Sequence, residues 1–389
     1  MRLQGTTKSS SLMRAVALSL FLASIAGCGG TSTPASITPG PTGSGQVVDV
    51  SGLHMTLNGS SWLSRGVVLQ GFVRPLAALQ AGNDPARLNA RLNYGAAELA
   101  AIRAYDADTI RFQIGQPSLD PNSPLYDADY LTQVVTAIKQ ARQAGFVVMI
   151  MMQDESISGE PAEHPLPTAE TQSDWDLFTT AFGSDRGVVF ELYNEPSLSA
   201  SQANWQLWLN GGLVTGQTVP SIGMQALINH VRSKGAQNVF VLDGLGYAST
   251  LHGVPVVTDP LNRLVYAVHP YQHGSADESQ WDAEFGIPSA SLPVWADEWS
   301  AATDMQLGLG SLPSYQVAVD LLNYLRAHSI PVCTGTFDMP RFVVQNIPGW
   351  TLTNYDNYSA TSTTEGSGTL VHIDFAANYG RALTLSDGL

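Results

Sequence analysis

The chain has 389 residues, 44% of them hydrophobic, which is enough apolar sequence for one large core or two ordinary ones. Its formal net charge is −15 at pH 7, and no basic stripe or cluster offsets that charge. Nucleic-acid binding needs a surface of the opposite sign, so this class of function is excluded.

The first 27 residues have the pattern of an export signal. The segment from Met1 to Arg14 is basic, and the apolar run from Ala15 to Ala26 is too short to cross a bilayer as a helix. The sequence Ile25-Ala26-Gly27-Cys28 then resembles the lipobox of bacterial lipoproteins, in which the cysteine carries the lipid. We expect a lipoprotein signal peptide over residues 1–27 and a lipid anchor at Cys28 in the cell envelope, facing the periplasm or the outside. Ordinary signal cleavage nearby is the alternative.

Residues 28–46 are rich in Ser, Thr, Pro and Gly, a composition that predicts a flexible linker. The folded domain is expected to occupy residues 47–389. Cys333 lies in an apolar run, and we expect its thiol to be buried and unreactive.

Strand and helix patterns alternate along this domain. Asn58-Gly59 lies between two short strand-like pieces and indicates a small N-terminal β-hairpin, a lid that leads into the first barrel strand at residues 66–69. Apolar runs predict further strands at residues 108–112, 146–152, 188–190, 238–242, 264–268, 294–297 and 331–336. Helices are predicted at residues 96–104, 129–144, 222–234 and 315–328, with another starting at Ser173 as its N-cap, and residues 369–375 are expected to form a late strand.

Eight strands that alternate with helices predict an α/β fold, a single (β/α)8 TIM barrel. A doubly wound open sheet is the competing fold. No Gly-x-Gly-x-x-Gly sequence follows the first strand, which counts against a dinucleotide site there.

Polar residues follow several predicted strands, where active sites of such barrels lie. Asn194 and Glu195 end the fourth strand and Glu298 ends the seventh, so the two carboxylates are expected to face each other across the barrel mouth. Paired carboxylates are what glycosidic cleavage needs, one as a proton donor and one as a partner for the developing cation. Three more polar residues lie at the ends of the second and sixth strands: Arg111, His269 and Tyr271.

This ordered set resembles glycoside hydrolase family 5, the cellulase-like enzymes. The resemblance implies a retaining mechanism with Glu195 as acid/base and Glu298 as nucleophile. It also implies that Asn194 binds the sugar 2-hydroxyl, that Arg111 and Tyr271 hold the nucleophile, and that His269 lines the −1 subsite. It implies no metal and no cofactor.

The chain departs from the family pattern at two places. Gln153 stands where the family usually has a histidine after the third strand. The sugar-stacking tryptophan is missing directly after the eighth strand, so either Phe337 or Trp350 is expected to replace it. Trp299, beside Glu298, is expected to line a subsite. Other tryptophans that could form subsites or pack in the core are Trp175, Trp205, Trp208 and Trp281.

Other chemistries are disfavoured. The chain contains no Gly-x-Ser-x-Gly sequence, which would indicate a serine hydrolase, and no His-Glu-x-x-His sequence, which would indicate a zinc protease. The main alternative is a surface-anchored glycan-binding lipoprotein on a degenerate, catalytically silent barrel. We expect a monomeric, retaining endo-type glycosidase that acts on a β-linked polysaccharide or oligosaccharide of the glucan, cellulose or mannan type. Its two carboxyl groups should lie about 5 Å apart.

Overall fold

The computed structural model describes residues 45–82, 84–154, 164–271, 278–300, 314–340, 342–354, 367–376 and 382–387. The chain divides into two units, residues 1–37 and 38–389, and every described residue belongs to the second. The predicted signal peptide, Cys28 and most of the linker therefore lie outside the described residues. Within these ranges, no helix is both long enough and apolar enough to cross a membrane.

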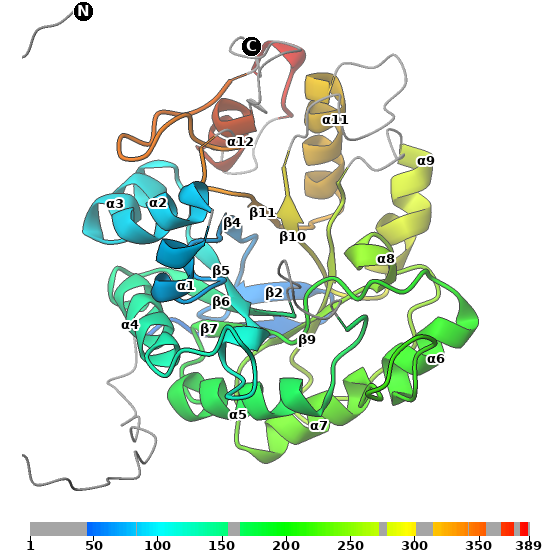
Figure 1. The fold of residues 1–389 in the computed structure, drawn as a ribbon. Helices are drawn as coiled ribbons and strands as arrows, with labels where there is room; N and C mark the ends of the chain where they lie inside the picture. The colour runs from blue at the N-terminus through cyan, green and yellow to red at the C-terminus, as the bar shows by residue number, and fades with distance from the viewer. Residues whose placement is uncertain are drawn as a thin grey trace, which may run out of the picture. The chain divides into compact units, whose positions relative to one another are not determined.

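Eight parallel strands close into a barrel, in which each strand pairs with the next along the chain and the last pairs with the first (Figure 1). These strands are β4 (Arg65–Leu69), β5 (Thr109–Gly115), β6 (Val147–Gln153), β7 (Val188–Glu191), β8 (Phe240–Asp243), β9 (Leu264–Val268), β10 (Val294–Trp299) and β11 (Val332–Thr334). The predicted (β/α)8 barrel is confirmed, and the open sheet is excluded because β11 pairs with β4.

Helices surround the strands, as Figure 1 shows. Those before β8 are α1 (Leu76–Ala81), α2 (Pro85–Asn93), α3 (Ala96–Ala104), η1 (Gln116–Ser118), α4 (Tyr130–Gln143), α5 (Ala169–Phe182), α6 (Gln202–Asn210) and α7 (Met224–Ser233). Those after β8 are α8 (Leu245–Ala248), α9 (Glu278–Trp281), η2 (Asp282–Gly286), α10 (Ile287–Ser289), α11 (Ser314–Ala327), α12 (Ser367–Ala376) and η5 (Leu385–Asp387).

The side chains of each barrel strand alternate between two cores, because successive residues of a strand point to opposite faces. Inward residues such as Val68, Met149, Val241 and Trp295 fill the barrel. Outward residues pack against the helices in a larger outer core. Cys333 belongs to the inner core, and burial raises the pKa of its thiol, so the predicted buried thiol is confirmed.

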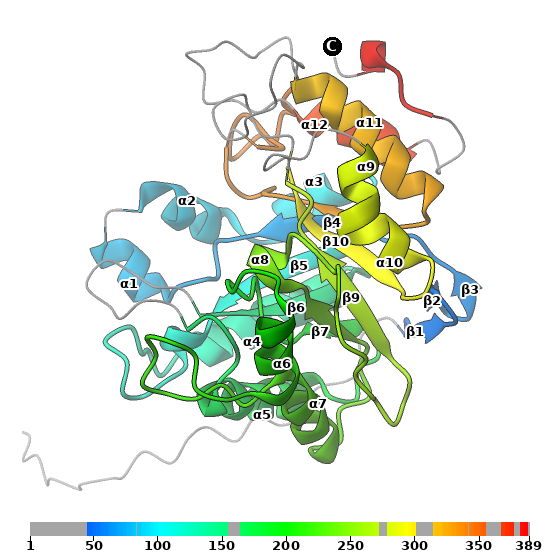
Figure 2. The ribbon, with the colours of Figure 1, turned by 90° about the vertical axis from the view of Figure 1, so that its right-hand side faces the viewer.

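A small antiparallel sheet precedes the barrel, formed by β1 (Val48–Ser51), β2 (His54–Leu57) and β3 (Ser60–Ser61). Asn58 and Gly59 join β2 to β3 with φ of 54° and 81°, which confirms the predicted hairpin. The sheet lies at the amino-terminal end of the barrel strands (Figure 2). There the Val48 N–H donates to the Arg186 carbonyl, and the Trp62 ring packs against Trp295 with ring centroids 6.0 Å apart. The lid therefore closes the end of the barrel opposite its mouth.

Two local predictions are wrong. The helix predicted to start with Ser173 as its N-cap begins at Ala169, because Thr168, five residues before Ser173, is the N-cap and forms a capping box with Thr171. The strand predicted at residues 369–375 is part of α12, whose Leu370, Val371 and Phe375 pack in the outer core. A closed barrel has no edge to which a late strand could be added.

Candidate active site

The predicted polar residues meet at the carboxyl-terminal ends of the barrel strands. Asn194 and Glu195 follow β7, His269 and Tyr271 follow β9, and Glu298 lies near the end of β10. Arg111, predicted to end its strand, is instead the third of the seven residues of β5, and its side chain reaches the others from there. Parallel strands bring their carboxyl ends to the same rim, so residues almost two hundred positions apart come into contact.

Arg111 is the fully buried centre of this group. Its Nε and Nη2 donate to the two carboxylate oxygens of Glu191 at 2.6 Å each, and Nη2 also donates to Asn194 Oδ1 at 2.8 Å. Its Nη1 donates to Glu298 Oε2. The planar guanidinium therefore fixes two carboxylates and one amide with a single charge.

Glu298 is held in its ionised form. Tyr271 Oη donates to Glu298 Oε1 at 2.8 Å, and Arg111 holds the other oxygen. Burial alone would raise the pKa of Glu298, but the charges of Arg111 and then His269 outweigh burial and lower this pKa to about 2. Its side chain is still 15% exposed, so a substrate can reach it.

Glu195 has a different environment. Its backbone is in the left-handed region at φ 48°, and its N–H donates to Asp243 Oδ2 at 2.8 Å. A hydrogen bond of 2.8 Å joins Glu195 Oε1 to His269 Nδ1. The side chain is 26% exposed. One carboxylate oxygen of Glu195, one of Glu298 and one ring nitrogen of His269 all lie within 4.8 Å of one another.

A bulge in β10 explains why two carboxylates in succession reach the site. Ala296 pairs with Val332 and Trp299 pairs with Thr334, so three steps along β10 match two along β11. Asp297 contacts His269 and Glu298 contacts Arg111, whereas Trp299 packs in the outer core. The prediction that Trp299 lines a subsite is wrong, because the extra residue turns its side chain outward.

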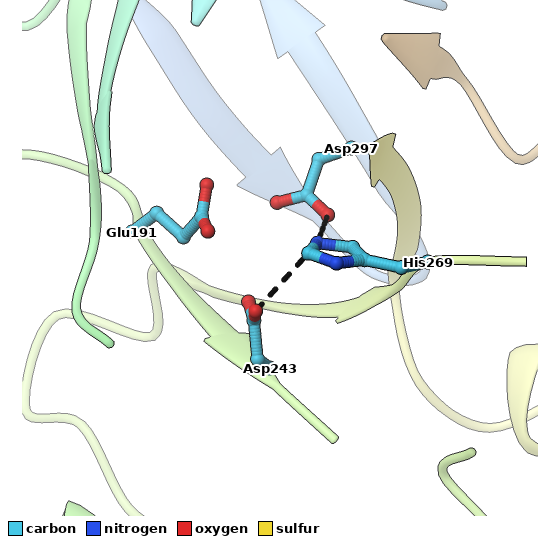
Figure 3. Close-up of side chains that lie close together, drawn as sticks. All are labelled: Glu191, Asp243, His269 and Asp297. Atoms are coloured by element: carbon cyan, nitrogen blue, oxygen red, sulfur yellow. Dashed lines mark ion pairs between the residues drawn. The ribbon is translucent and has the colours of Figure 1, made fainter. Parts of the chain in front are cut away.

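Four buried side chains meet just below the mouth: Glu191, Asp243, His269 and Asp297 (Figure 3). Their donor atoms lie within 4.8 Å of one another, a spacing that a metal ion could bridge. Glu191 is already chelated by the Arg111 guanidinium, which supplies a positive charge at this place. The arrangement is therefore that of an ion-pair network in which Arg111 is the permanent cation and His269 adds a second positive charge when it is protonated.

A cavity of about 580 Å³ opens over Glu195 and Glu298. His269 and Tyr271 also line it, together with Tyr247, Phe342 and backbone at Gly335. Arg111 and Asn194 lie behind the two carboxylates and are buried. Gln153 is half-buried at the end of β6, and its role stays a prediction.

The remaining predicted aromatic residues are turned away from the described lining of the cavity. Phe337 is 1% exposed and packs against Tyr105, with ring centroids 5.5 Å apart. Trp350 is half-buried against the outer core. Neither belongs to the described lining of the cavity, because both pack in the outer layer between strands and helices. The same core holds Trp175, Trp205, Trp208 and Trp281.

Sequence reasoning missed Tyr247, Phe342, Asp243 and Asp297. Asp243 could have been found, since it directly follows the apolar run Phe240-Val241-Leu242 of a predicted strand. Asp297 precedes Glu298, but only the bulge directs both side chains inward. Tyr247 has no comparable signal, because its place depends on a left-handed turn in α8, where Gly246, Tyr247 and Ala248 have φ of 67°, 61° and 54°.

A closed parallel barrel with two facing carboxylates at its mouth is the arrangement that glycosidases of the (β/α)8 class use. The sequence model of the cellulase family (glycosyl hydrolase family 5) matches residues 93–334, more than half of the chain. The chain therefore belongs to glycoside hydrolase family 5, and the predicted resemblance is confirmed.

Solved structures agree with this fold. A beta-glucanase from Saccharophagus degradans is 17% identical in its native form, with a TM-score of 0.65, 90% of this chain covered and 98% of that one. Its complex with cellotetraose is 18% identical, with a TM-score of 0.64 and the same coverage. The catalytic domain of an endoglucanase from Thermobifida fusca is 17% identical, with a TM-score of 0.56 and coverage of 85% and 97%. A search of curated protein sequences returned no match.

Proposed function

We propose that this glycosidase cleaves a β-linked glucan or its oligosaccharides with retention of anomeric configuration. The observation that carries the proposal is the carboxylate pair, with oxygens of Glu195 and Glu298 within 4.8 Å of each other. Retaining glycosidases hold these carboxyl groups about 5 to 5.5 Å apart, whereas inverting ones leave room for a water at about 6.5 to 9.5 Å. The beta-glucanase whose structure was solved with cellotetraose supports glucan as the sugar.

In the proposed reaction, Glu298 is the nucleophile, because Arg111 and Tyr271 keep its carboxylate ionised. Glu298 attacks the anomeric carbon while Glu195 protonates the glycosidic oxygen, so that bond breaks and a glycosyl ester of Glu298 forms. Glu195 then takes a proton from water, which attacks the same carbon and releases Glu298. Because Arg111 occupies the amide oxygen of Asn194, the amide nitrogen is left as a donor for a sugar hydroxyl.

The experiment that tests this function is turnover of a panel of β-glucan, mannan and xylan oligosaccharides by wild type and by Glu298→Ala. Wild type is expected to cleave the glucan oligomers and to release products with retained configuration, which NMR can follow. Cleavage inside the chain rather than from its ends would establish endo action. Binding without any cleavage would support the silent glycan-binding alternative instead.

Tyr247 is expected to hold the departing sugar. Its side chain is 58% exposed at the cavity, and its N–H donates at 3.0 Å to the carbonyl of Pro196, directly after the proposed acid. An exposed aromatic ring beside the acid offers a stacking surface worth about 1 kcal/mol. Tyr247→Ala should therefore lower kcat/KM for oligosaccharides about fivefold. Tyr247→Phe should keep wild-type values.

An exposed tyrosine elsewhere provides the control for this prediction. Tyr126 is 44% exposed and does not belong to the cavity lining, so Tyr126→Ala should leave kcat/KM unchanged. Hydrolysis of an aryl glycoside with no departing sugar should be affected by Tyr247→Ala much less than hydrolysis of oligosaccharides. An equal loss on both substrates would contradict the assignment of Tyr247 to the departing side.

We also propose that the enzyme is exported and lipid-anchored through Cys28, a proposal supported by the lipobox-like sequence. Cys28→Ala should move the protein from the membrane fraction to the soluble fraction after cell lysis. Cys333→Ala is the matched control, because Cys333 is the buried thiol of the inner core, and this variant should stay with the membrane. Wild type that is soluble and carries no fatty acid would exclude the anchor.

A further inference from the structure

Two buried aspartates lie behind the residue that contacts the proposed acid. His269 Nδ1 faces Glu195. On the other side of the ring, His269 Nε2 lies 3.2 Å from Asp297 Oδ1 and 3.6 Å from Asp243 Oδ2 (Figure 3). The side chains of His269, Asp243 and Asp297 are all fully buried. One nitrogen of the ring therefore faces Glu195 in the cavity, and the other faces carboxylates that no substrate reaches.

Asp243 also fixes the backbone of the acid. Its Oδ2 accepts the Glu195 N–H at 2.8 Å, in the left-handed conformation that few residues adopt without support. The Asp243 carboxylate thus contacts both the main chain of Glu195 and the Nε2 side of the His269 ring. One side chain therefore positions both partners of the Glu195–His269 hydrogen bond.

We propose that Asp243 and Asp297 are positioning residues that keep a proton on His269 Nε2, so that Nδ1 and Glu195 Oε1 share one further proton, which is the proton given to the departing sugar. The inference rests on the glycosidase function proposed above, and adds two residues and a proton-holding role to it. A carboxylate that selects one tautomer of a catalytic imidazole is a known device in other hydrolases.

The charges around the ring favour this protonation. Burial alone would lower the pKa of His269, but Glu298, Asp297, Glu195 and Asp243 together raise it well above its usual value. Burial and Asp297 raise the pKa of Asp243 to about 7, against the lowering effect of His269 and Arg111. Among the residues that the structure describes, the titratable or charged groups that face this cluster are Glu191, Asp243, Asp297, Glu195, Glu298, Arg111, Tyr271 and the Cys333 thiol.

The proton balance holds through both steps of the reaction. In the first step the shared proton leaves for the glycosidic oxygen as that bond breaks and the ester of Glu298 forms. Nδ1 and the Glu195 carboxylate then face each other without a proton between them, which makes the pair a stronger base. In the second step a proton of the attacking water enters this gap, the ester bond breaks, and the starting state returns.

The proposal predicts the direction in which the pH dependence of kcat/KM shifts when an aspartate is replaced. The proton given to the departing sugar is shared with a ring that two aspartates keep protonated, so its loss depends on the charge of those aspartates. The alkaline limb of kcat/KM reports the loss of this proton. Asp297→Asn removes a negative charge and offers an N–H to Nε2, which moves the ring proton to Nδ1 and leaves Glu195 ionised. The alkaline limb should therefore move to lower pH.

The test compares wild type, Asp297→Asn and a control on two substrates as a function of pH. On a glucan oligosaccharide, Asp297→Asn should lose about 10- to 100-fold in kcat at pH 7, and its alkaline limb should move down by about one pH unit. On a 2,4-dinitrophenyl glycoside, whose leaving group departs without protonation, formation of the glycosyl ester should keep its wild-type rate. Asp259→Asn, which removes another buried aspartate that pairs with Arg232, should move neither quantity.

Unchanged pH profiles and an unchanged ratio between the two substrates in folded Asp297→Asn would overturn the inference. A second measurement stands apart from catalysis: ¹⁵N NMR of the full chain, with His269 assigned through His269→Gln, reports which ring nitrogen carries a proton. Nε2 should be protonated in wild type and not in Asp297→Asn. If wild type cleaves neither substrate, the proposed function fails, and the NMR result alone supports or overturns the role of the aspartates.

Discussion

Glu298→Ala is expected to stop hydrolysis of every oligosaccharide that the wild-type protein cleaves, with kcat lower by roughly 10⁴-fold or more. The variant lacks the atom that forms the ester, and Arg111 and Tyr271 then have no carboxylate to orient. Steady-state kinetics on the best oligosaccharide of the panel measures the loss. Asp185→Ala is the control, since Asp185 pairs with Arg142 just before β7, at the opposite end of the barrel, and its loss should leave turnover of the folded protein intact.

Azide distinguishes a lost nucleophile from a damaged site. In Glu298→Ala a small anion can occupy the space of the missing carboxylate and attack the anomeric carbon directly, while Glu195 still protonates the departing oxygen. This is a single displacement, so the glycosyl azide should have inverted configuration. An azide product with retained configuration would show that another residue forms the covalent intermediate.

The barrel could be predicted because each strand carries its own signal. Runs such as Phe146–Met152 are apolar throughout, as strands covered on both faces must be, and the side chain that ends a run marks the rim. Glu195, His269 and Glu298 were found in this way, since parallel strands place all such ends together. Arg111 was placed at a strand end too early, because β5 continues to Gly115. The family resemblance then added a role for each residue.

The rest of the site depends on geometry that a linear pattern does not carry. One extra residue in β10 decides that Asp297 and Glu298 both point inward and that Trp299 points outward, and nothing in the sequence of that strand marks the bulge. Phe337 and Trp350 have aromatic rings of the kind that stack on sugars, but both pack against the outer core, where Tyr105 contacts Phe337. The Asp243–His269–Asp297 contacts join three strands, so they appear only once the barrel closes.

Glu195→Ala should have an effect that depends on the leaving group. For oligosaccharides, whose departing alcohol needs a proton, kcat should fall roughly 10²- to 10⁴-fold, the usual contribution of a general acid. For a 2,4-dinitrophenyl glycoside the glycosyl ester of Glu298 should still form rapidly, because that leaving group is stable as an anion. The ester should then accumulate, since no base remains to activate water, and a rapid burst of dinitrophenolate followed by slow turnover is expected.

Azide should relieve this second block by attacking the ester, because it needs no general base, and two displacements give a glycosyl azide of retained configuration. The opposite configurations from Glu195→Ala and Glu298→Ala would assign the two carboxylates from the products alone. The burst also distinguishes the loss of a positioning aspartate from the loss of the acid itself. Asp297→Asn keeps Glu195 as a base, so the glycosyl ester should accumulate little in this variant. Equal losses on both substrates in Glu195→Ala, without a burst, would mean that Glu195 shapes the site rather than transfers the proton.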